Sequence, residues 1–142
     1  MNSFYPESKF GGFTGVDGTV AFYSRVQALA QPETVAVDFG CGRGAYAADP
    51  IAYRRELRIL KGKVRRVIGL DANPSAVQNP FIDTFHLLEN CQPWPLADNS
   101  ADLCVCDNVI EHLPEPEYFF SEVRRVLCPG GVVCIRTPNR WN

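Results

Sequence analysis

Residues 35–44 read Val-Ala-Val-Asp-Phe-Gly-Cys-Gly-Arg-Gly, an apolar run that ends in glycines at alternate positions. A short apolar run of this kind is typical of a strand that is buried on both faces of a sheet. Glycines carry no Cβ, so they let the backbone turn tightly and approach a ligand closely. A helix that follows such a turn offers free N–H groups and the positive end of its dipole. We therefore expect a strand–turn–helix unit that binds a ligand.

The remaining sequence continues this alternation of strands and helices. Strands are expected at 35–39, 64–70, 84–88, 102–106 and 132–136, and helices at 19–30, 46–60, 75–79 and 115–127. Alternating elements indicate βαβ units with right-handed crossovers, and hence a mostly parallel sheet with helices on both faces. We predict an α/β fold of the doubly wound, Rossmann-like class. Ligands of such sheets bind beyond the carboxyl ends of the strands.

Composition limits the class of protein. A chain of 142 residues is one domain by size, and no apolar run approaches the ~20 residues of a membrane helix. The N-terminus lacks a secretory pattern, so we expect a cytoplasmic location and no membrane contact. The net charge of -2 argues neither for nucleic acid nor against it. The cations of residues 54–66 could contact phosphate or nucleic acid, and we favour a solvated helix face and turn over that alternative. The six cysteines and two histidines form no zinc pattern, so the cysteines are interpreted as small buried residues and no metal is expected.

The second expected strand ends at Asp71, where a carboxylate can accept hydrogen bonds from ribose hydroxyls. Gly40, Gly42 and Ala45 also satisfy the pattern G-x-G-x-x-G/A, which leaves an NAD(P) or flavin site open. A plain turn at the glycines and a helix-capping role for Asp71 before Pro74 remain open as well. These residues alone do not separate a nucleotide site from a structural turn.

Five segments, taken in order, resemble class I S-adenosylmethionine-dependent methyltransferases that modify small molecules or glycans. They are Val-Asp-Phe-Gly-Cys-Gly-Arg-Gly at 37–44, Trp-Pro-Leu-Ala-Asp-Asn-Ser-Ala-Asp at 94–102, Asp-Asn-Val-Ile-Glu-His-Leu at 107–113, Leu-Cys-Pro-Gly-Gly at 127–131 and Ile-Arg-Thr-Pro-Asn at 135–139. The resemblance implies the strand order 3-2-1-4-5 and S-adenosylmethionine as cofactor, with S-adenosylhomocysteine as product. The succession of five motifs favours this interpretation over an NAD(P) site.

The resemblance also implies roles for individual residues. The cofactor-binding residues would be Asp38, Gly40, Cys41, Gly42 and Gly44 at the methionine part, Asp71 at the ribose, Ala72 and Asn90 at the adenine, and Asp107 and Asn108 beside the reactive methyl group. Asn90 stands where the family often has an aspartate. An aromatic face can stabilise a sulfonium, and Phe13, Tyr23 and Phe39 are candidates for that role or for the core.

Glu111 and His112 are the candidate catalytic residues, because an oxygen or nitrogen acceptor can require a base. The alternative is that the pair ends a turn before Pro114. Related methyltransferases can hold a divalent ion in an E-x-x-E-H cluster, but Asn108 occupies its first carboxylate position here. The sequence therefore predicts no metal at this place.

We divide the chain into an aromatic-rich lid or helix segment at 1–33 and a cofactor-binding core at 34–142. The core lacks the last two strands of the complete family fold, so we expect truncation or a homodimer through the open edge of the fifth strand. Residues 10–25 resemble segments that precede methyltransferase cores in bacterial polysaccharide biosynthesis, which favours a sugar or small-molecule acceptor and O- over N-methylation. A cofactor-binding module without catalysis is the alternative.

Overall fold

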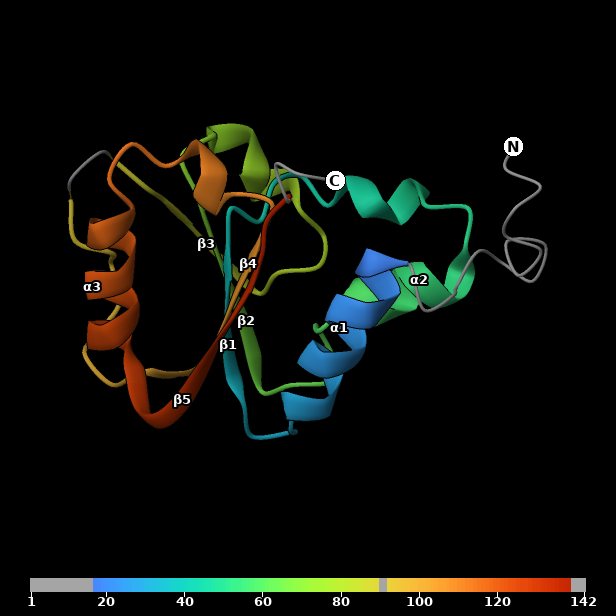
Figure 1. Ribbon diagram of the computed structural model, residues 1–142, viewed down its shortest axis with the longest axis horizontal. Helices are drawn as coiled ribbons and strands as arrows, with labels where there is room; N and C mark the ends of the chain where they lie inside the picture. The colour runs from blue at the N-terminus through green and yellow to red at the C-terminus, as the bar shows by residue number, and fades with distance from the viewer. Residues whose placement is uncertain (1–16, 90–91, 139–142) are drawn as a thin grey trace.

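Five parallel strands form the centre of the molecule in the computed structural model, which describes residues 17–89 and 92–138 (Figure 1). The strands are β1 (Val35–Phe39), β2 (Arg66–Asp71), β3 (Thr84–Leu87), β4 (Ala101–Asp107) and β5 (Leu127–Arg136). Their order in the sheet is β3-β2-β1-β4-β5, with all four pairings parallel. This confirms the predicted fold class and strand order. The order reverses between β1 and β4, and ligands of open parallel sheets bind at such a switch point.

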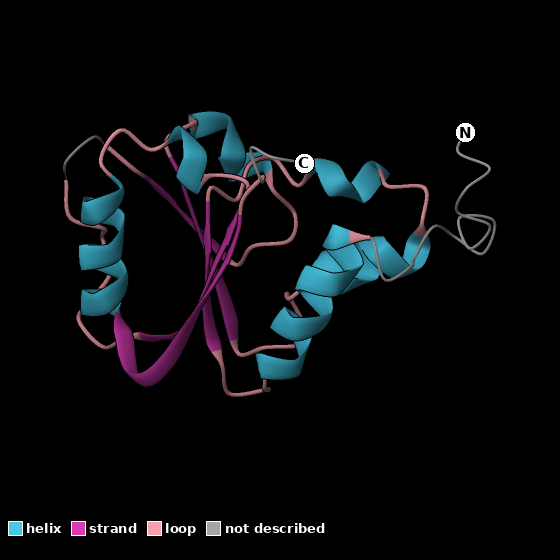
Figure 2. Ribbon diagram, viewed as in Figure 1, coloured by secondary structure: helices cyan, strands magenta, loops and turns pink. Residues whose placement is uncertain are grey.

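Helices cover both faces of the sheet (Figure 2). The helices are α1 (Gly18–Leu29), α2 (Ala52–Arg58) and α3 (Pro116–Val126), with short 3-10 turns η2 (Ala45–Ala48), η3 (Pro74–Gln78) and η4 (Ile110–His112). Figure 1 shows α3 on one face and both α1 and α2 on the other. Residues 1–16 of the expected N-terminal segment lie outside the described residues, and the division into 1–33 and 34–142 stays a prediction.

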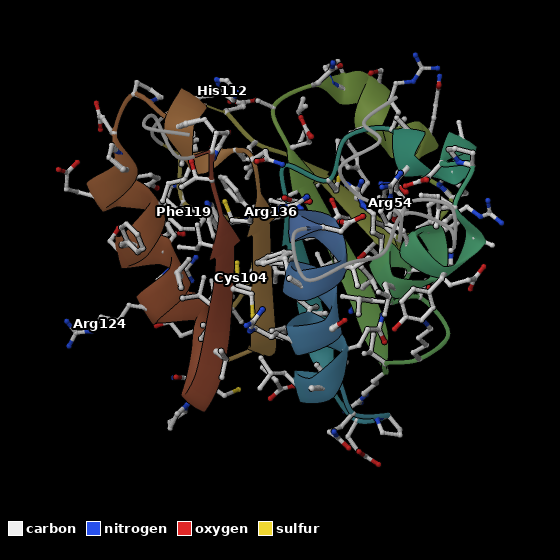
Figure 3. All side chains as sticks on the ribbon, turned by 45° about the vertical axis from the view of Figure 1, so that its right-hand side comes forward. Arg54, Cys104, His112, Phe119, Arg124 and Arg136 are labelled. Atoms are coloured by element: carbon white, nitrogen blue, oxygen red, sulfur yellow. The ribbon has the colours of Figure 1, made fainter. Side chains whose placement is uncertain are left out.

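The core has two layers because side chains alternate along each strand. Leu103 and Val105 of β4 face the α1 and α2 side, whereas Cys104 and Cys106 face α3. Each of these four side chains is at most 2% exposed. On the α3 side, Phe119 packs against the sheet while Arg124 of the same helix points into solvent (Figure 3). The two cysteines of β4 are thus the small buried residues that the alternation predicts.

One predicted helix is wrong in its extent. The expected helix at 46–60 divides into η2 and α2, with Asp49 and Pro50 between them. A residue before proline is driven out of the helical region, and Asp49 has an extended ψ of 121°. The Asp49 carboxylate then accepts the backbone N–H of Ile51, at the start of α2, at 2.9 Å. Proline therefore turns the chain and begins a second helix here.

Two strand boundaries also differ from the prediction. Strand β2 begins at Arg66 rather than at residue 64, because the backbone N–H groups of Lys63 and Val64 close a turn onto Leu60 O. Strand β5 begins at Leu127, before the Pro-Gly-Gly segment, rather than at Val132. Its pairing with β4 shifts between Ala101 and Leu103, which accommodates the irregular segment. The carboxyl ends of the strands, where the site lies, keep the predicted positions within one residue.

Candidate functional site

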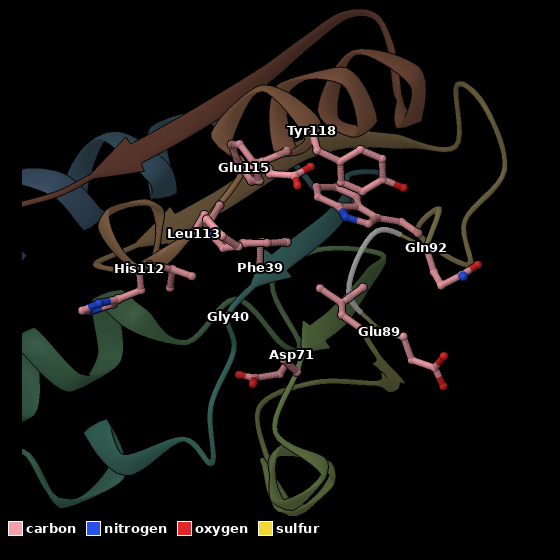
Figure 4. Close-up of a pocket in the computed structure, with 15 residues that line it drawn as sticks. Phe39, Gly40, Asp71, Glu89, Gln92, His112, Leu113, Glu115 and Tyr118 are labelled. Atoms are coloured by element: carbon pink, nitrogen blue, oxygen red, sulfur yellow. The ribbon is translucent and has the colours of Figure 1, made fainter.

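Two cavities lie at the carboxyl edge of the sheet, and Gly40 lines both of them. The larger cavity measures about 490 Å³, and its lining includes Phe39, Asp71, Ala72, Leu88, Glu89, Gln92, Trp94, Val109, His112, Leu113, Glu115 and Tyr118. Figure 4 shows Asp71 and Glu89 on one side of it and Glu115 and Tyr118 on the other. The smaller cavity measures about 260 Å³ and is lined by Tyr23, Asp38, Arg58, Asp107 and the loop at 40–46. The larger cavity is predominantly apolar, whereas charged groups surround the smaller one.

The glycine loop after β1 adopts a backbone that only glycine accepts without strain. Gly40, Gly42 and Gly44 have φ angles of 72°, 53° and 73°. A Cβ on Gly40 would collide with the Val109 side chain, and one on Gly44 would lie 2.8 Å from Asn79 Oδ1. The Gly40 N–H donates to Leu70 O at 2.7 Å. The loop is therefore held close to its neighbours at Gly40 and Gly44, where a side chain has no room.

Asp71 and Asn79 fix this loop from the β2 side. Asp71 Oδ2 accepts the backbone N–H of Gly42 at 2.8 Å, and Asp71 Oδ1 accepts that of Asn73 at 2.8 Å. Asn79 Nδ2 donates to the carbonyls of Cys41 at 2.9 Å and Gly42 at 3.2 Å. Each Asp71 oxygen retains acceptor capacity beyond its single N–H bond. The carboxylate both holds the loop and faces the larger cavity.

Asp107 is the centre of a charged cluster at the smaller cavity. Its Oδ2 accepts a hydrogen bond from the Tyr23 hydroxyl at 2.9 Å and another from Arg136 Nη2 at 2.8 Å. Arg136 Nε pairs with Oδ1 of the same carboxylate, and Arg136 Nη1 donates to Thr19 Oγ1 at 2.8 Å. Arg136 thus joins the end of β5 to α1 (Figure 3). Only 8% of the Asp107 side chain is exposed, so these bonds act in a poorly solvated setting.

Asp38 lies at the end of β1 and faces the same small cavity. Burial and, after it, the nearby carboxylate of Asp107 raise its pKa to about 7, against a lowering effect of Arg58. The pKa of Tyr23 is also raised, first by burial and then by Asp107. A cation in this cavity would favour the ionised form of Asp38. The site therefore has an acidic group whose charge depends on what occupies the cavity.

The structure brings most of the predicted cofactor residues to these cavities. Asp38, Gly40, Cys41, Gly42, Gly44 and Asp107 line the smaller one, while Gly40, Asp71 and Ala72 line the larger one. Asn108 is exposed, lines neither cavity, and donates to Asp107 Oδ1 at 3.0 Å. Its φ of 55° is unusual for a residue other than glycine. Asn90 and Phe13 lie outside the described residues, so their roles stay predictions.

The candidate base pair Glu111–His112 lies in the short turn η4. The two side chains approach to 4.0 Å, but the His112 side chain is 78% exposed. Glu111 Oε2 accepts a hydrogen bond from Thr137 Oγ1 at 3.1 Å. His112 lines the larger cavity and Glu111 lines neither. The backbone N–H of His112 closes the turn onto Val109 O at 2.9 Å, in keeping with the alternative that the pair ends a turn.

Sequence reasoning missed several residues of the site. Arg58 lies over the Tyr46 ring at 4.5 Å and near the Tyr23 ring at 5.3 Å, inside the smaller cavity. The sequence offered Arg58 only as one cation among many in 54–66. The Trp94 ring stacks on the Phe39 ring with centroids 5.1 Å apart, and this pair belongs to the aromatic core while also lining the larger cavity. The distance between Arg58 and its partners along the chain hides this arrangement from a local motif.

The other basic residues of the stretch at 54–66 are mostly engaged within the fold. Arg54 pairs with Asp17 and Asp49, Arg55 donates to Asp49 O, and Lys61 donates to Ile82 O. Among the described residues, no group of three His, Cys, Asp or Glu side chains is placed to hold a metal ion. In the described part of the chain, no helix is long and apolar enough to cross a membrane. The five described cysteines are free thiols, with the pKa of Cys41 raised to about 12 by burial.

Comparison with known proteins gives the family. Residues 37–135 match the family described as "Methyltransferase domain". A probable S-adenosylmethionine-dependent methyltransferase of Mycolicibacterium smegmatis is 42% identical over 109 residues, which are 73% of this chain and 38% of the relative. A similarly named protein of Mycobacterium tuberculosis is 35% identical over the same length, covering 73% of this chain and 35% of the relative. The chain thus spans little more than a third of the length of these two relatives.

Solved structures agree on the fold. A methyltransferase solved in complex with the Trm112 methyltransferase activator of Haloferax volcanii has a TM-score of 0.60 and 27% identity, covering 82% of this chain and 51% of that chain. The S-adenosylmethionine-dependent methyltransferase of Mesorhizobium loti has a TM-score of 0.57 and 21% identity, and the match covers 84% of this chain and 54% of that chain. Together, the domain match, the relatives and the sheet order show that the chain belongs to the methyltransferase domain family, whose members use S-adenosylmethionine.

Proposed function

We propose that this chain binds S-adenosylmethionine across the two joined cavities and that the enzyme it forms methylates an oxygen of a small molecule or sugar. The observation that carries the proposal is the position of Asp71. Its carboxylate anchors the glycine loop through Gly42 and also faces the larger cavity. A carboxylate at the end of the second strand, beside such a loop, suits the two hydroxyls of a ribose. The nucleoside would therefore lie in the larger cavity.

The shape and chemistry of the larger cavity fit a nucleoside. Gly40 lines both cavities, so the proposal places one ligand along the Gly40 backbone with a part in each. Ala72, Leu88 and Leu113 offer apolar contacts, and the edge of the Phe39–Trp94 pair adds an aromatic wall. Flat apolar walls with a few polar groups are typical of sites for small cofactors. Glu89 and Gln92 add polar groups to the same cavity.

The smaller cavity fits the amino-acid part of the cofactor. Asp38 and Asp107 supply negative charge for an ammonium and for the sulfonium. S-adenosylmethionine, when bound, supplies an electrophilic methyl group on sulfur. The residues of this chain would then act mainly by orienting that end of the cofactor, and alignment of reacting groups is worth up to ~7–11 kcal/mol. Tyr23 is fixed by its bond to Asp107 and forms part of the wall.

The acceptor would enter past η4, where Glu111 and His112 lie. His112 is exposed at the rim of the larger cavity, where its imidazole could act as the general base for an entering acceptor. A hydroxyl acceptor needs such a proton acceptor more than a neutral amine does, which supports assigning the pair to O-methylation. The preference for sugar hydroxyls rests on the resemblance of residues 10–25 to segments that precede polysaccharide methyltransferases.

The test is formation of S-adenosylhomocysteine from S-adenosylmethionine in the presence of matched acceptor panels. One panel carries sugar and small-molecule hydroxyls and the other carries primary amines of similar size. We expect turnover with hydroxyl acceptors and a loss of about 10²–10⁴-fold in His112→Asn, the usual range for removing a general base. His86→Asn is the matched control, because His86 lies on β3 and lines neither cavity.

Other results would select other functions. Tight cofactor binding with no turnover on either panel would favour a binding module without catalysis. Turnover with amines alone would contradict O-methylation, and unchanged turnover in His112→Asn would contradict the assigned base. Binding of NADH in place of S-adenosylhomocysteine would favour the NAD(P) alternative.

A further inference from the structure

Arg58 is a half-buried cation whose hydrogen-bond donors the described fold does not use fully. It extends from the last residue of α2 into the smaller cavity, where 26% of its side chain stays exposed. Its guanidinium is clamped between aromatic rings, 4.5 Å from the centre of Tyr46 and 5.3 Å from that of Tyr23. This stacking fixes the direction of the guanidinium without consuming its N–H donors.

Those donors are poorly satisfied. Among the described residues, Arg58 Nε is buried and has no hydrogen-bond partner. The guanidinium makes one hydrogen bond within the described part of the chain, from Nη2 to Asp107 Oδ2, and that bond is long at 3.5 Å. Asp107 is already occupied by Tyr23 and Arg136 at shorter distances. A buried polar group without a partner in a native structure needs an explanation, and a missing ligand is one.

The groups around Arg58 indicate the charges and the size of a ligand that would fit there. Asp38 and Asp107 lie in the same cavity of about 260 Å³, so positive and negative groups face each other across a small space. The loop beside them passes through Gly40, Gly42 and Gly44, which leaves backbone rather than side chains along the wall. A cavity with one planar cation and two carboxylates complements a zwitterion, with a carboxylate at the arginine and an ammonium at the acids.

The geometry points to Arg58 as the residue that binds the α-carboxylate of the cofactor's methionine part, with Asp38 and Asp107 facing its ammonium. This inference rests on the proposed binding of S-adenosylmethionine and deepens it, because it assigns a recognition role to a helix outside the glycine motif. Arg58 would then act as a specificity-determining residue that separates amino-acid-bearing nucleosides from simple ones. Arg43 also lines the cavity and is the rival cation, but it is exposed on the loop.

The test is calorimetric titration of the 142-residue chain with two ligands: S-adenosylhomocysteine and its decarboxylated form, which keeps the ammonium. We expect the wild type to prefer S-adenosylhomocysteine. Arg58→Met should weaken S-adenosylhomocysteine binding about 10- to 100-fold, as expected for loss of a charge-assisted bond, and change binding of the decarboxylated ligand less than about twofold. Arg55→Met is the matched control on the same helix, and it should change neither affinity.

Three outcomes would overturn the inference. Equal weakening of both ligands in Arg58→Met would mean that Arg58 only shapes the cavity. Loss of the preference in Arg43→Met but not in Arg58→Met would assign the carboxylate to Arg43. A folded wild type that binds neither ligand would instead overturn the proposed function, and the inference with it.

A second variant covers the case in which Arg58→Met fails to fold, which ligand-free thermal unfolding would reveal. Arg58→Lys keeps the charge and loses the planar fork. It should retain part of the preference for S-adenosylhomocysteine and bind the decarboxylated ligand as the wild type does. A complete loss of that preference with unchanged stability would contradict a carboxylate bound mainly through charge.

Discussion

The larger and the smaller cavity of the site are built by different kinds of contact. At the larger cavity, the key groups follow consecutive strand ends, and Asp71 reaches Gly42 over 29 residues of sequence. At the smaller cavity, Asp107 joins Tyr23 from α1, Arg58 from α2 and Arg136 from β5, at separations of 84, 49 and 29 residues. Apolar side chains and the Asp71 carboxylate dominate the lining of the first cavity, whereas charged side chains and the glycine loop dominate the second. Substitutions should therefore act differently in the two regions.

Substitution in the glycine loop should cause the largest loss of stability. In Gly40→Ala, a φ of 72° strains a residue that carries a Cβ, and that Cβ collides with Val109. Strain of about 1–2 kcal/mol and overpacking of about 1–3 kcal/mol together predict a loss of about 2–5 kcal/mol in the free energy of unfolding. Chemical denaturation measures this loss, and S-adenosylhomocysteine binding should vanish with it.

Gly62→Ala is the matched control for that loss. Its φ is 83°, but no atom lies within 4 Å of the added Cβ, so only strain of about 1–2 kcal/mol remains. If Gly40→Ala and Gly62→Ala lowered the free energy of unfolding equally, close packing at the glycine loop would contribute nothing to stability.

Substitution in the charged cluster around Asp107 should also lower the free energy of unfolding, through the loss of a poorly solvated charge. Asp107→Asn keeps the shape of the side chain and removes the charge that Arg136 and Arg58 face. Removing one partner of a fully buried pair costs about 3–5 kcal/mol, and partial exposure of both arginines reduces our expectation to about 2–3 kcal/mol. Asp98→Asn is the control, because the Asp98 side chain is 70% exposed and its pair with Arg125 should contribute under about 1 kcal/mol. Similar losses in the two variants would remove the distinction between a buried cluster and a surface pair.

Asp38 should make ligand binding depend on pH. Its folded-state pKa is raised to about 7, so the carboxyl is mostly protonated at pH 6 and mostly ionised at pH 8. An ammonium binds the ionised form, so affinity for S-adenosylhomocysteine should rise with pH, by up to roughly tenfold between pH 6 and 8. Calorimetry across this range tests the sign, and Asp38→Asn should flatten the profile. An affinity that falls with rising pH, or an unchanged slope in Asp38→Asn, would show that Asp38 does not interact with the ligand's ammonium.

The sheet, the glycine loop and Asp71 could be predicted because their signals are local. Strand ends, alternate glycines and Asp71 occupy short windows, and the parallel arrangement places strand ends on one edge. The burial of Cys104 and Cys106 on one face followed from alternation along β4. The undivided helix at 46–60 was wrong because the prediction gave no weight to Pro50, which changes the backbone of the residue before it.

The charged cluster could not be predicted because no short window contains it. Tyr23 fitted a core position of the expected helix at 19–30, and only the tertiary structure places its hydroxyl on Asp107. Arg58 occurs among other cations in the sequence, and its stacking on Tyr46 joins the last residue of α2 to η2, two elements that the sequence analysis merged into one helix. A sequence signal did exist for Asp107, at the end of a strongly apolar strand, but its arginine partners had none.

Calorimetric titration of S-adenosylhomocysteine into the wild type and Asp71→Ala tests the central claim most directly, namely that the strand-end carboxylate and the glycine loop form a site for this cofactor. The account predicts binding by the wild type and a loss of at least about 30-fold in Asp71→Ala, because a charged acceptor of hydrogen bonds is removed. Asp71→Asn, which can still accept the Gly42 N–H, should fall between them. Equal affinities in the wild type and a folded Asp71→Ala, or binding of NADH without binding of S-adenosylhomocysteine, would contradict the account.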